Sequence, residues 1–372
     1  MIYLDNAATT GKKPSTVIRA VSDALNNSAN PGRASHKAGL RALNIIYDTR
    51  EALSELFKIK SPERFILTPN ATYGLNFAIK GILKPGDHCI TTSMEHSSVT
   101  RPLHSIRDIE ITELKGDEYG FVNPEDFLKS IKQNTKLIII NHSSNVNGII
   151  QDIEGVYRLV KDKNIPVLID ASQSAGILDI NPEHFSMIAF PGHKGLYGPQ
   201  GTGGLYISPS VYPDTIIEGG TGSNSEELIN PPFLPDRYES GTLNTPGFAG
   251  LTEGIKFVQR NGIKNILSYE RELILLLLSS LMNMKGITVY TPFDANRISN
   301  LLAFNIDGMD SSEAARILDS EFDIAVRPGF HCAYPAHQRL GTTKKGAVRV
   351  SVSYFNKKEE ILKFIDAVNK II

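Results

Sequence analysis

Short apolar runs alternate with helix-like stretches between about residues 64 and 210, and this alternation constrains the fold more than any other feature of the chain. The runs are continuously apolar, which is typical of strands that are buried on both faces of a parallel sheet. Right-handed crossovers through the intervening helices would cover both faces. The sequence therefore predicts an α/β fold with a mainly parallel seven-stranded sheet, with strands over 65–67, 89–91, 109–112, 137–141, 167–170, 188–190 and 204–207.

A smaller α+β domain is expected after this sheet. Residues 211–245 are rich in Pro, Gly, Ser and Asn, which predicts a long connection with little regular structure. A helical stretch over about 247–284 then leads to a pattern of strands at 301–306, 324–327 and 347–352 and helices at 311–320 and 357–371. Two further helices, over 14–26 and 35–57, are expected to flank the large domain, with Ser35 as the cap of the second.

We therefore divide the chain into three parts. Residues 1–14 form an N-terminal segment, 15–250 a large domain, and 251–372 a small C-terminal domain. The small domain would begin with the bridging helix and contain a loop over 327–345 that carries Cys332. A length of 372 residues agrees with one large domain and a smaller one attached to it.

Composition excludes several classes of protein. The net charge of -1 provides no electrostatic attraction for nucleic acid or an anionic membrane. No signal peptide is visible at the start of the chain, and the longest apolar runs are far shorter than the roughly 20 residues that a membrane span needs. Two cysteines, Cys89 and Cys332, exclude a disulfide framework and fit a reducing compartment. We expect a cytoplasmic protein.

The candidate functional residues follow the predicted strands closely. Asn70 to Thr72, His96, Asn145, Asp170 and Lys194 each come shortly after a strand. In parallel sheets, ligands bind beyond the carboxyl ends of the strands. We therefore expect these residues to meet at one edge of the sheet.

Lys194 lies in a loop with His193 and several glycines, directly after the apolar run 187–190. A lysine that a strand end delivers into a partly dry loop has its pKa lowered by desolvation, which makes it a usable amine near neutral pH. Such an amine can form a Schiff base with an aldehyde cofactor. Taken alone, this run is more typical of a lysine that faces solvent.

Asp170 ends an apolar strand, where a carboxylate needs a partner. A pyridinium N–H is a suitable partner, and a helix cap is the competing interpretation. Gln173, three residues later, could reach the phenolic oxygen of the same cofactor or could face solvent. The cofactor that these residues together indicate is pyridoxal 5'-phosphate.

Three other positions could hold the ring and phosphate of this cofactor. The turn from Pro69 to Gly74 joins a strand to a helix, and the free N–H groups at the helix start, with the Thr72 hydroxyl, form a natural phosphate cradle. Ordinary helix capping is the alternative. The flat ring of His96 could stack on a heterocycle, although a loop histidine is more often at the surface. His193 could donate to the phosphate.

Two residues of the small domain could act on a substrate. Cys332 lies in a loop that contains proline and glycine, where Arg327 and His331 are expected to be positive neighbours that favour a thiolate. Cys89 lies within a strand and fits the role of a small buried apolar residue. Arg349 alternates with apolar residues on a strand and needs an anion, either a substrate carboxylate or an internal Asp or Glu.

Other kinds of site are not supported by the sequence. Cys332, His331 and His337 do not have the spacing of a zinc site, so we expect no metal. A Gly-x-Ser-x-Gly nucleophile motif and a Gly-rich phosphate loop are both absent from the sequence.

In this order and spacing, the motifs resemble the class V aminotransferase family, of pyridoxal phosphate fold type I. Within that family, the chain is similar to the group II cysteine desulfurases, a branch that also holds enzymes resembling selenocysteine lyase. The resemblance covers nearly the whole chain and is carried by residues 3–8, Arg33 and His36, 70–72, 95–96, 144–148, 170–173, 192–199, 238–242, 327–333 and Arg349.

The resemblance implies a role for each matching residue. Lys194 would carry the cofactor and act as the base, Cys332 would accept the sulfur, and His96 would stack over the ring and take part in catalysis. The remaining cofactor contacts would come from Ala71, Thr72, Asn145, Asp170, Gln173 and His193, with Gly241 and Thr242 reaching the phosphate of a second subunit in a homodimer. Asn145, Arg349 and His36 would position the amino acid.

The activity that this resemblance implies is removal of sulfur from L-cysteine, which leaves L-alanine and a persulfide on Cys332 for a sulfur-acceptor protein. Two departures from the group II pattern concern the substrate and acceptor: Phe330 replaces the first of two histidines, and Pro191 replaces a serine. The alternatives are an aminotransferase, a lyase (including selenocysteine lyase) or an epimerase of the same family, with no persulfide step. A non-catalytic scaffold is a third alternative, against which Lys194, Asp170 and His96 together argue.

Overall fold

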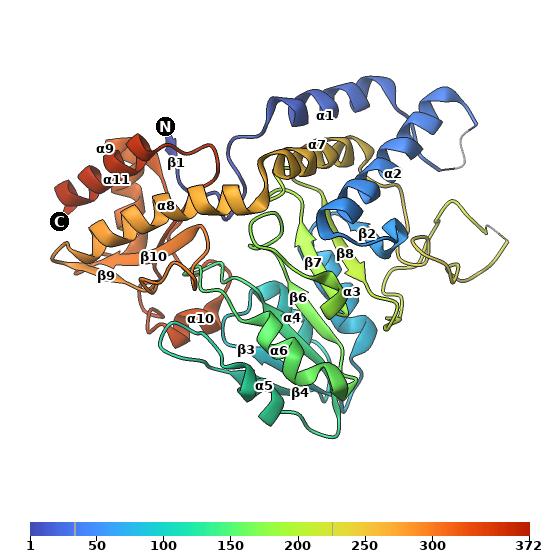
Figure 1. Cartoon of the computed structure of the whole chain (residues 1–372), viewed down its shortest axis with the longest axis horizontal. Coiled ribbons are helices and arrows are strands. Elements are labelled where there is room, and N and C mark those ends of the chain that lie inside the picture. Colours follow the sequence, from blue (N-terminus) through green and yellow to red (C-terminus); the bar gives the residue numbers. More distant parts are fainter. Residues whose placement is uncertain (33–34, 225) are drawn as a thin grey trace.

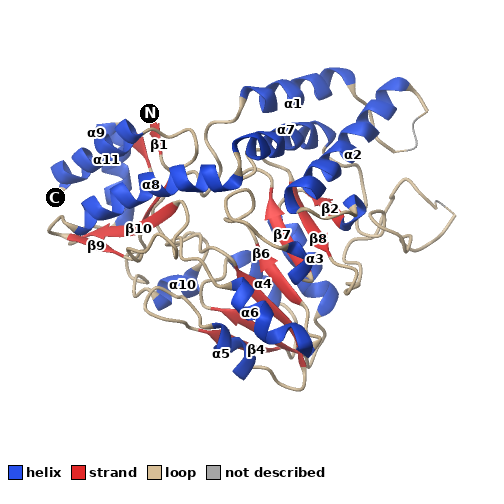
Figure 2. Cartoon of the chain, in the orientation of Figure 1, coloured by secondary structure: helices blue, strands red, loops and turns tan. Residues whose placement is uncertain are grey.

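A seven-stranded sheet forms the centre of the larger part of the computed structural model, which describes residues 1–32, 35–224 and 226–372 (Figures 1 and 2). Its strands, in order across the sheet, are β2 (Phe65–Thr68), β8 (Gly203–Ile207), β7 (Met187–Pro191), β6 (Val167–Asp170), β5 (Thr135–Asn141), β3 (His88–Thr92) and β4 (Glu110–Leu114). β8 runs antiparallel to both of its neighbours, and the pairs from β7 to β4 are parallel. The predicted α/β fold and all seven predicted strands are therefore confirmed.

Alternate residues of each central strand enter two different cores, which explains why the strands are apolar throughout. On β5, Ile138 and Ile140 pack into one cluster with α2 and α6, whereas Leu137 and Ile139 pack into another with α3 and α4. Cys89 is fully buried in the second cluster, as predicted. The helices of this part are α1 (Ser15–Asn27), α2 (Lys37–Phe57), α3 (Ala71–Ile82), α4 (Ser97–His104), α5 (Pro124–Lys129), α6 (Ile153–Val160) and α7 (Thr245–Asn261), with 3-10 turns at Pro62–Arg64, Lys161–Lys163 and Pro182–His184.

Two helix predictions were wrong in detail. The cap of α2 is His36 rather than Ser35, because the Nδ1 atom of His36 accepts a hydrogen bond from the Gly39 N–H at 3.2 Å. The helical stretch predicted over 247–284 is two helices, α7 and α8 (Ile263–Met282), separated by Gly262. Gly262 has φ +80°, a conformation that a glycine adopts without strain and that ends α7.

The smaller part contains a three-stranded antiparallel sheet in the order β12 (Val348–Ser351), β10 (Leu301–Ile306) and β9 (Ile287–Val289). The strand β9 was not predicted because it has only three residues and none of them is buried. α8 lies against this sheet, and the other helices are α9 (Ser311–Phe322), α10 (Tyr334–Arg339) and α11 (Lys358–Ile371). The short strand β11 (Ile324–Ala325) precedes the loop that carries Cys332.

The N-terminal segment connects the two parts. Its strand β1 (Ile2–Tyr3) pairs in parallel with β11, and Asp5 forms a bridge with Ser351 (Figure 1). Thr10, a few residues later, contacts the loop that follows β7. The division of the chain near residue 250 stays a prediction, but the segment 1–14 is placed where it can join both parts to a common site.

The segment that follows β8 is a long irregular connection. Between β8 and α7, the described residues contain no helix or strand, in agreement with the predicted long connection. In the ranges that the structure describes, no helix has the length and apolar character to cross a membrane.

Candidate active site

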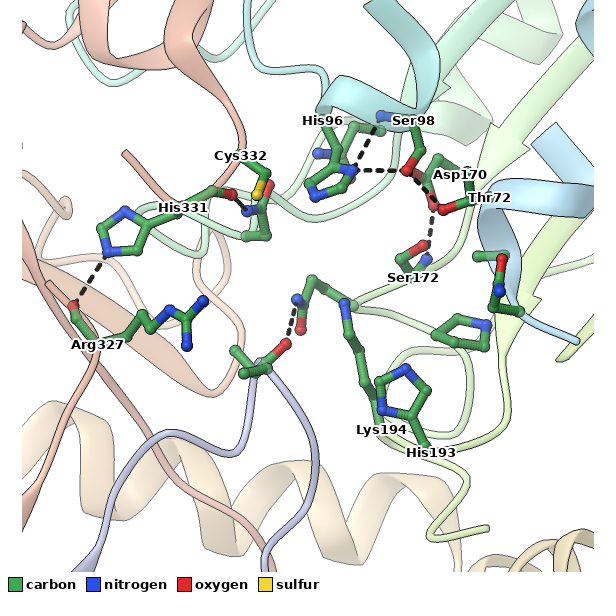
Figure 3. A pocket seen from close by; sticks show the side chains of 18 of the residues that line it. Thr72, His96, Ser98, Asp170, Ser172, His193, Lys194, Arg327, His331 and Cys332 are labelled. Atoms are coloured by element: carbon green, nitrogen blue, oxygen red, sulfur yellow. Dashed lines mark hydrogen bonds between the residues drawn. The ribbon is translucent and has the colours of Figure 1, made fainter. Parts of the chain in front are cut away.

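A cavity of about 270 Å³ lies at the carboxyl ends of the parallel strands, between the two parts of the chain (Figure 3). It brings together residues that are up to 342 positions apart in the sequence, from Ala7 to Arg349. The predicted site residues among its walls are Ala71, Thr72, His96, Asn145, Asp170, Gln173, His193, Lys194, Cys332 and Arg349. Their meeting at one edge of the sheet is thus observed, whereas their individual roles remain predictions.

The register of the sheet explains this meeting. Asn141 on β5 lies opposite Asp170 on β6, which lies opposite Ala189 on β7, so three neighbouring strands end at the same level. The chain then turns away from the sheet, and residues that follow these strands line the cavity. Asp170 is 1% exposed, and its Oδ1 accepts a hydrogen bond from the Ser172 N–H at 2.9 Å.

The loop after β7 presents Lys194 to the cavity. The Gly198 N–H donates to the Gly192 carbonyl at 2.8 Å, which closes the loop, and a Cβ atom on Gly195 would lie only 2.5 Å from the Ala175 carbonyl. Burial lowers the pKa of Lys194 to about 8, and the carboxylate of Asp170 opposes this effect. The amine is therefore partly neutral near neutral pH, as the sequence predicted.

The N-terminal segment holds this loop from the other side. The His193 carbonyl accepts hydrogen bonds from the Thr10 N–H at 3.1 Å and from the Lys13 ammonium at 2.9 Å. Burial lowers the pKa of Lys13 to about 8 as well. Sequence reasoning missed Lys13, because nothing in the local pattern separates it from an exposed lysine.

His96 is the cap of α4 as well as a wall of the cavity. Its Nδ1 atom accepts a hydrogen bond from the Ser98 N–H at 3.1 Å and lies 2.9 Å from the Ser98 hydroxyl. Burial lowers the pKa of His96 to about 4, with an opposing effect of Asp170, so its ring is neutral near neutral pH. A neutral, flat ring beside Asp170 is suited to stacking on a heterocycle.

The start of α3 provides a polar cradle. Asn70 caps this helix by accepting a hydrogen bond from the Tyr73 N–H at 3.1 Å, and Ala71 and Thr72 are its first two residues. Their backbone N–H groups have no partner within the helix. The Thr72 hydroxyl lies 2.8 Å from the Ser98 hydroxyl, which also lines the cavity. Ser98 was missed in the sequence, although its position two residues after His96 at a helix start was the available signal.

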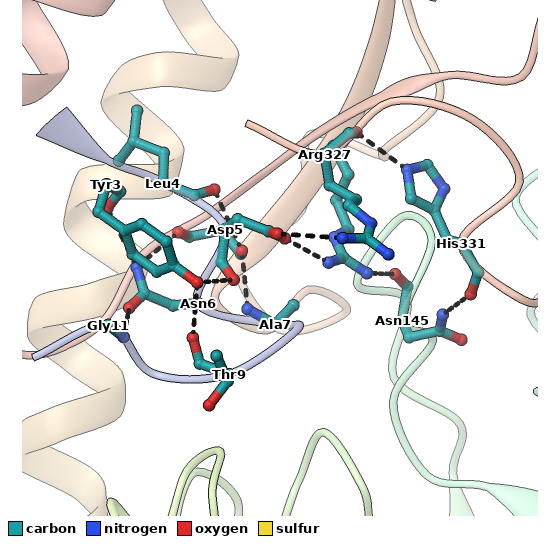
Figure 4. A network of polar contacts seen from close by, with 12 residues as sticks. Tyr3, Leu4, Asp5, Asn6, Ala7, Thr9, Gly11, Asn145, Arg327 and His331 are labelled. Atoms are coloured by element: carbon teal, nitrogen blue, oxygen red, sulfur yellow. Dashed lines mark hydrogen bonds and ion pairs between the residues drawn. The ribbon is translucent and has the colours of Figure 1, made fainter. Parts of the chain in front are cut away.

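Figure 4 shows a polar network around Asp5, Asn145 and Arg327. This network, which sequence reasoning did not resolve, also holds Arg349. Arg349 is 3% exposed, and its guanidinium donates to Asp5 Oδ1 at 2.7 Å and to the Asn145 carbonyl at 2.9 Å. Arg327 lies 3.8 Å from the other oxygen of Asp5. Of the two partners proposed for Arg349, the internal carboxylate is thus present, while its Nε atom has no hydrogen-bond partner within the described chain and remains able to donate to a substrate.

The Cys332 loop is fixed by its backbone. The Cys332 carbonyl accepts hydrogen bonds from the Ser97 N–H at 2.7 Å and the Ser97 hydroxyl at 2.8 Å, and the His331 carbonyl accepts one from the Asn145 amide at 2.6 Å. His331 and Cys332 have φ +49° and +55°, in the left-handed region of backbone conformation that residues other than glycine rarely adopt. The Cys332 side chain is exposed while it lines the cavity.

One expectation about this loop was wrong. His331 is not a positive neighbour of Cys332, because it is 8% exposed and burial holds its pKa well below the usual range. Its Nε2–H donates to the Arg327 carbonyl at 3.1 Å (Figure 4). Arg327 remains the charged residue of this loop that lines the cavity.

Three predicted site residues do not reach the cavity of this chain. His36 caps α2, and Gly241 and Thr242 line a separate hollow with residues of α2 and of the 220–222 turn. Action of Gly241 and Thr242 on a second subunit stays a prediction. Arg33, which contributes to the family resemblance, lies outside the described residues.

Comparisons with known proteins give a consistent result. A model of the class V aminotransferases matches residues 2–364. A probable cysteine desulfurase of Methanothermobacter thermautotrophicus is 34% identical, with 97% of this chain and 92% of that protein covered, and one of Pyrococcus abyssi is 31% identical, with 100% and 94% covered. Among solved structures, the apo form of a cysteine desulfurase from Thermococcus onnurineus NA1 has a TM-score of 0.90 at 30% identity, covering 100% of this chain and 94% of that one.

Proposed function

This chain belongs to the class V aminotransferase family, and from that premise we propose that it is a cysteine desulfurase that depends on pyridoxal phosphate. The reaction would convert L-cysteine and the Cys332 thiol into L-alanine and a Cys332 persulfide. The observation that carries the proposal is the presence of an exposed cysteine in the same cavity as a lysine with a lowered pKa and a buried aspartate.

The residues present fit this cofactor. Lys194 would be its point of attachment, Asp170 would accept from its pyridine N–H, Gln173 would meet its phenolic oxygen, and His96 would stack on its ring. The start of α3, with Ala71, Thr72 and His193, would hold its phosphate. The buried His193 Nδ1 and Asn145 Oδ1 atoms both lack a hydrogen-bond partner among the described residues, as expected of groups whose partner is a ligand.

When bound, the cofactor supplies an electron sink for the pair of electrons released at the substrate Cα. Lys194 is the base for that proton. Its pKa of about 8 leaves a useful fraction of neutral amine near neutral pH, so Lys194 would be able to take that proton whenever it is not attached to the cofactor. The later return of a proton to the carbon skeleton can use the same ammonium.

Arg349 is proposed to bind the substrate carboxylate. Its contacts with Asp5 and the Asn145 carbonyl fix the plane of the guanidinium, and its Nε–H is left to donate. Arg327 lies 3.8 Å from the other oxygen of Asp5, so the two arginines together carry one more positive charge than Asp5 balances, and a substrate carboxylate would balance it. Asn145, whose amide also holds the Cys332 loop, would orient the same carboxylate.

Cys332 is the proposed sulfur acceptor. Its thiolate attacks the substrate sulfur, so that a sulfur–sulfur bond forms and the bond between sulfur and the substrate Cβ breaks. The electron pair of the broken bond stays with the carbon skeleton, which takes up a proton and leaves as L-alanine. Exposure of the Cys332 side chain is compatible with delivery of the persulfide to an acceptor protein.

We also propose a homodimer. Gly241 and Thr242 lie away from the cavity of their own chain, and the exposed face of α2 carries the apolar side chains Leu40, Leu43 and Tyr47. Burial of that face against a second copy would bring Gly241 and Thr242 toward the phosphate of the partner. His36, at the start of the same helix, would then be near the interface rather than beside its own substrate.

Mass spectrometry after brief exposure of the purified protein to L-cysteine tests the function. We expect a gain of one sulfur on the peptide that contains Cys332, together with release of L-alanine. The matched variants are Cys332→Ala, which should keep the cofactor absorbance and lose both products, and Lys194→Ala, which should lose the cofactor absorbance. Bound cofactor with neither alanine nor added sulfur in the unmodified protein would instead favour a lyase, epimerase or aminotransferase.

A further inference from the structure

Besides His331, a second buried histidine contacts the Cys332 loop. His337 lies on α10, is fully buried, and is not among the residues that line the cavity. Its Nε2 atom is 3.2 Å from His331 Nδ1, and its Nδ1 atom is 2.6 Å from the Thr342 hydroxyl. The proposed reaction does not use this residue directly.

The donor and the acceptor of each hydrogen bond can be assigned by starting from the Arg327 carbonyl at one end of the series. The Arg327 carbonyl can only accept, so His331 must carry its proton on Nε2, which lies 3.1 Å away. His331 Nδ1 is then an acceptor, and the N–H that it accepts from is His337 Nε2–H. His337 Nδ1 in turn accepts from the Thr342 O–H. Each of the two rings is therefore neutral with its proton on Nε2, and every link of the chain has one donor and one acceptor.

Packing reinforces this arrangement. The rings of His331 and His337 have centroids 5.3 Å apart and an interplanar angle of 29°, which is compatible with a hydrogen bond between their edges. Phe330, which replaces a histidine of the family pattern, packs edge-on against His337 at 5.4 Å. Burial lowers the pKa of His337 to about 4, against a smaller opposing effect of the Phe330 carbonyl, so the neutral pair is maintained near neutral pH.

The loop needs such support because its conformation is unfavourable. His331 and Cys332 both occupy the left-handed region, which is unfavourable for a residue with a side chain and persists only where the surroundings hold it. Ser97 donates to the Cys332 carbonyl, and the Asn145 amide donates to the His331 carbonyl. The hydrogen bonds of the His331 ring connect it to the Arg327 carbonyl and to His337.

We propose that His337 is a positioning residue for Cys332: by donating from Nε2 to His331, it keeps the nucleophilic thiol oriented into the cavity. This inference rests on the proposed function only for its effect on turnover. Its effect on the loop itself is independent of the reaction.

The test compares three variants in the holoenzyme. His337→Gln places an amide N–H near the position of the lost Nε2–H, so this variant should preserve the link to His331. His337→Asn can contact Thr342 but is too short to reach His331, and His337→Ala contacts neither. The readouts are hydrogen–deuterium exchange of the amides over 328–336, the absorbance of the bound cofactor, and the kcat and KM for alanine release from L-cysteine.

We expect the Asn and Ala variants to exchange the 328–336 amides at least tenfold faster and to lose at least tenfold in kcat, with KM and cofactor absorbance changed less than twofold. The Gln variant should remain within threefold of the unmodified protein in both. Equal behaviour of the Gln and Asn variants, or unchanged exchange in the Ala variant, would overturn the proposal. If the unmodified protein releases no alanine, the proposed function fails, while the exchange measurements still decide the role of His337.

Discussion

Replacement of Lys194 by methionine should stabilise the protein once any cofactor has been removed, and the gain should depend on pH. The pKa of Lys194 falls from 10.5 to about 8 because the folded protein desolvates its ammonium. One pKa unit corresponds to about 1.4 kcal/mol, so holding the charged amine in the cavity costs about 3 kcal/mol at pH 7. Methionine has a similar length and no charge, and it avoids this cost.

The sign of the pH dependence follows from proton binding. Between about pH 8 and 10.5 the unfolded chain binds more protons at Lys194 than the folded protein does, so the stability of the unmodified protein rises with pH. The advantage of Lys194→Met should consequently shrink by about 2 kcal/mol between pH 7 and pH 9.5. The pKa values of His96 and His193, which Lys194 helps to lower, are about 4, far below the pH range compared, so titration of these two residues contributes little to the difference.

Urea unfolding of both proteins at pH 7 and pH 9.5 measures this difference. Lys129→Met is the control, since the Lys129 side chain is 74% exposed and its replacement should change the free energy of unfolding by less than about 0.5 kcal/mol at either pH. An advantage of Lys194→Met that stays constant, or grows, as the pH rises would refute the claim that desolvation lowers this pKa.

Three further outcomes are expected from substitutions around the cavity and in the core. Asp5→Asn removes the counter-ion of buried Arg349, which should lower the free energy of unfolding by about 3 kcal/mol in urea titrations and raise the KM for L-cysteine in initial-rate measurements. Burial raises the pKa of Glu270 from 4.5 to about 8, so the stability of the unmodified protein should fall as the pH rises through this range. The stability of Glu270→Gln relative to the unmodified protein should therefore increase from pH 5.5 to pH 8.5 in the same titrations. Ser98→Ala removes a hydroxyl that lies beside Thr72, and we expect roughly tenfold weaker binding of the cofactor phosphate, about 1.4 kcal/mol, in equilibrium dialysis.

The central sheet could be predicted because the sequence signals that specify each strand are local. Each strand is a short apolar run bounded by polar or glycine-containing turns, and burial on both faces removes any need for alternation. The same reasoning placed Asp170 and Lys194 at one edge, since parallel strands end together. The break at Gly262 and the strand β9 were not predicted, because helix periodicity continues across the glycine and β9 is short and incompletely buried.

Some residues of the site could be predicted from the sequence, whereas others could not. Residues that follow a strand carry a local signal, whereas Asp5, Lys13 and His337 act through partners that are distant in sequence or through burial that only the fold creates. Asp5 meets Arg349 across 344 positions of the chain. His331 was expected to be cationic from its sequence neighbours, but tertiary burial makes it neutral and turns its ring toward Arg327.

The strands of the large sheet, their order along the chain and the residue types at their ends can be read from the sequence alone, because apolar periodicity and turn chemistry act over a few neighbouring residues. Tertiary packing determines which of those residues share a cavity, how far each is desolvated, and which hydrogen-bond partners fix Arg349 and the Cys332 loop. Desolvation and long-range pairing depend on the whole packed chain, so no local pattern contains them.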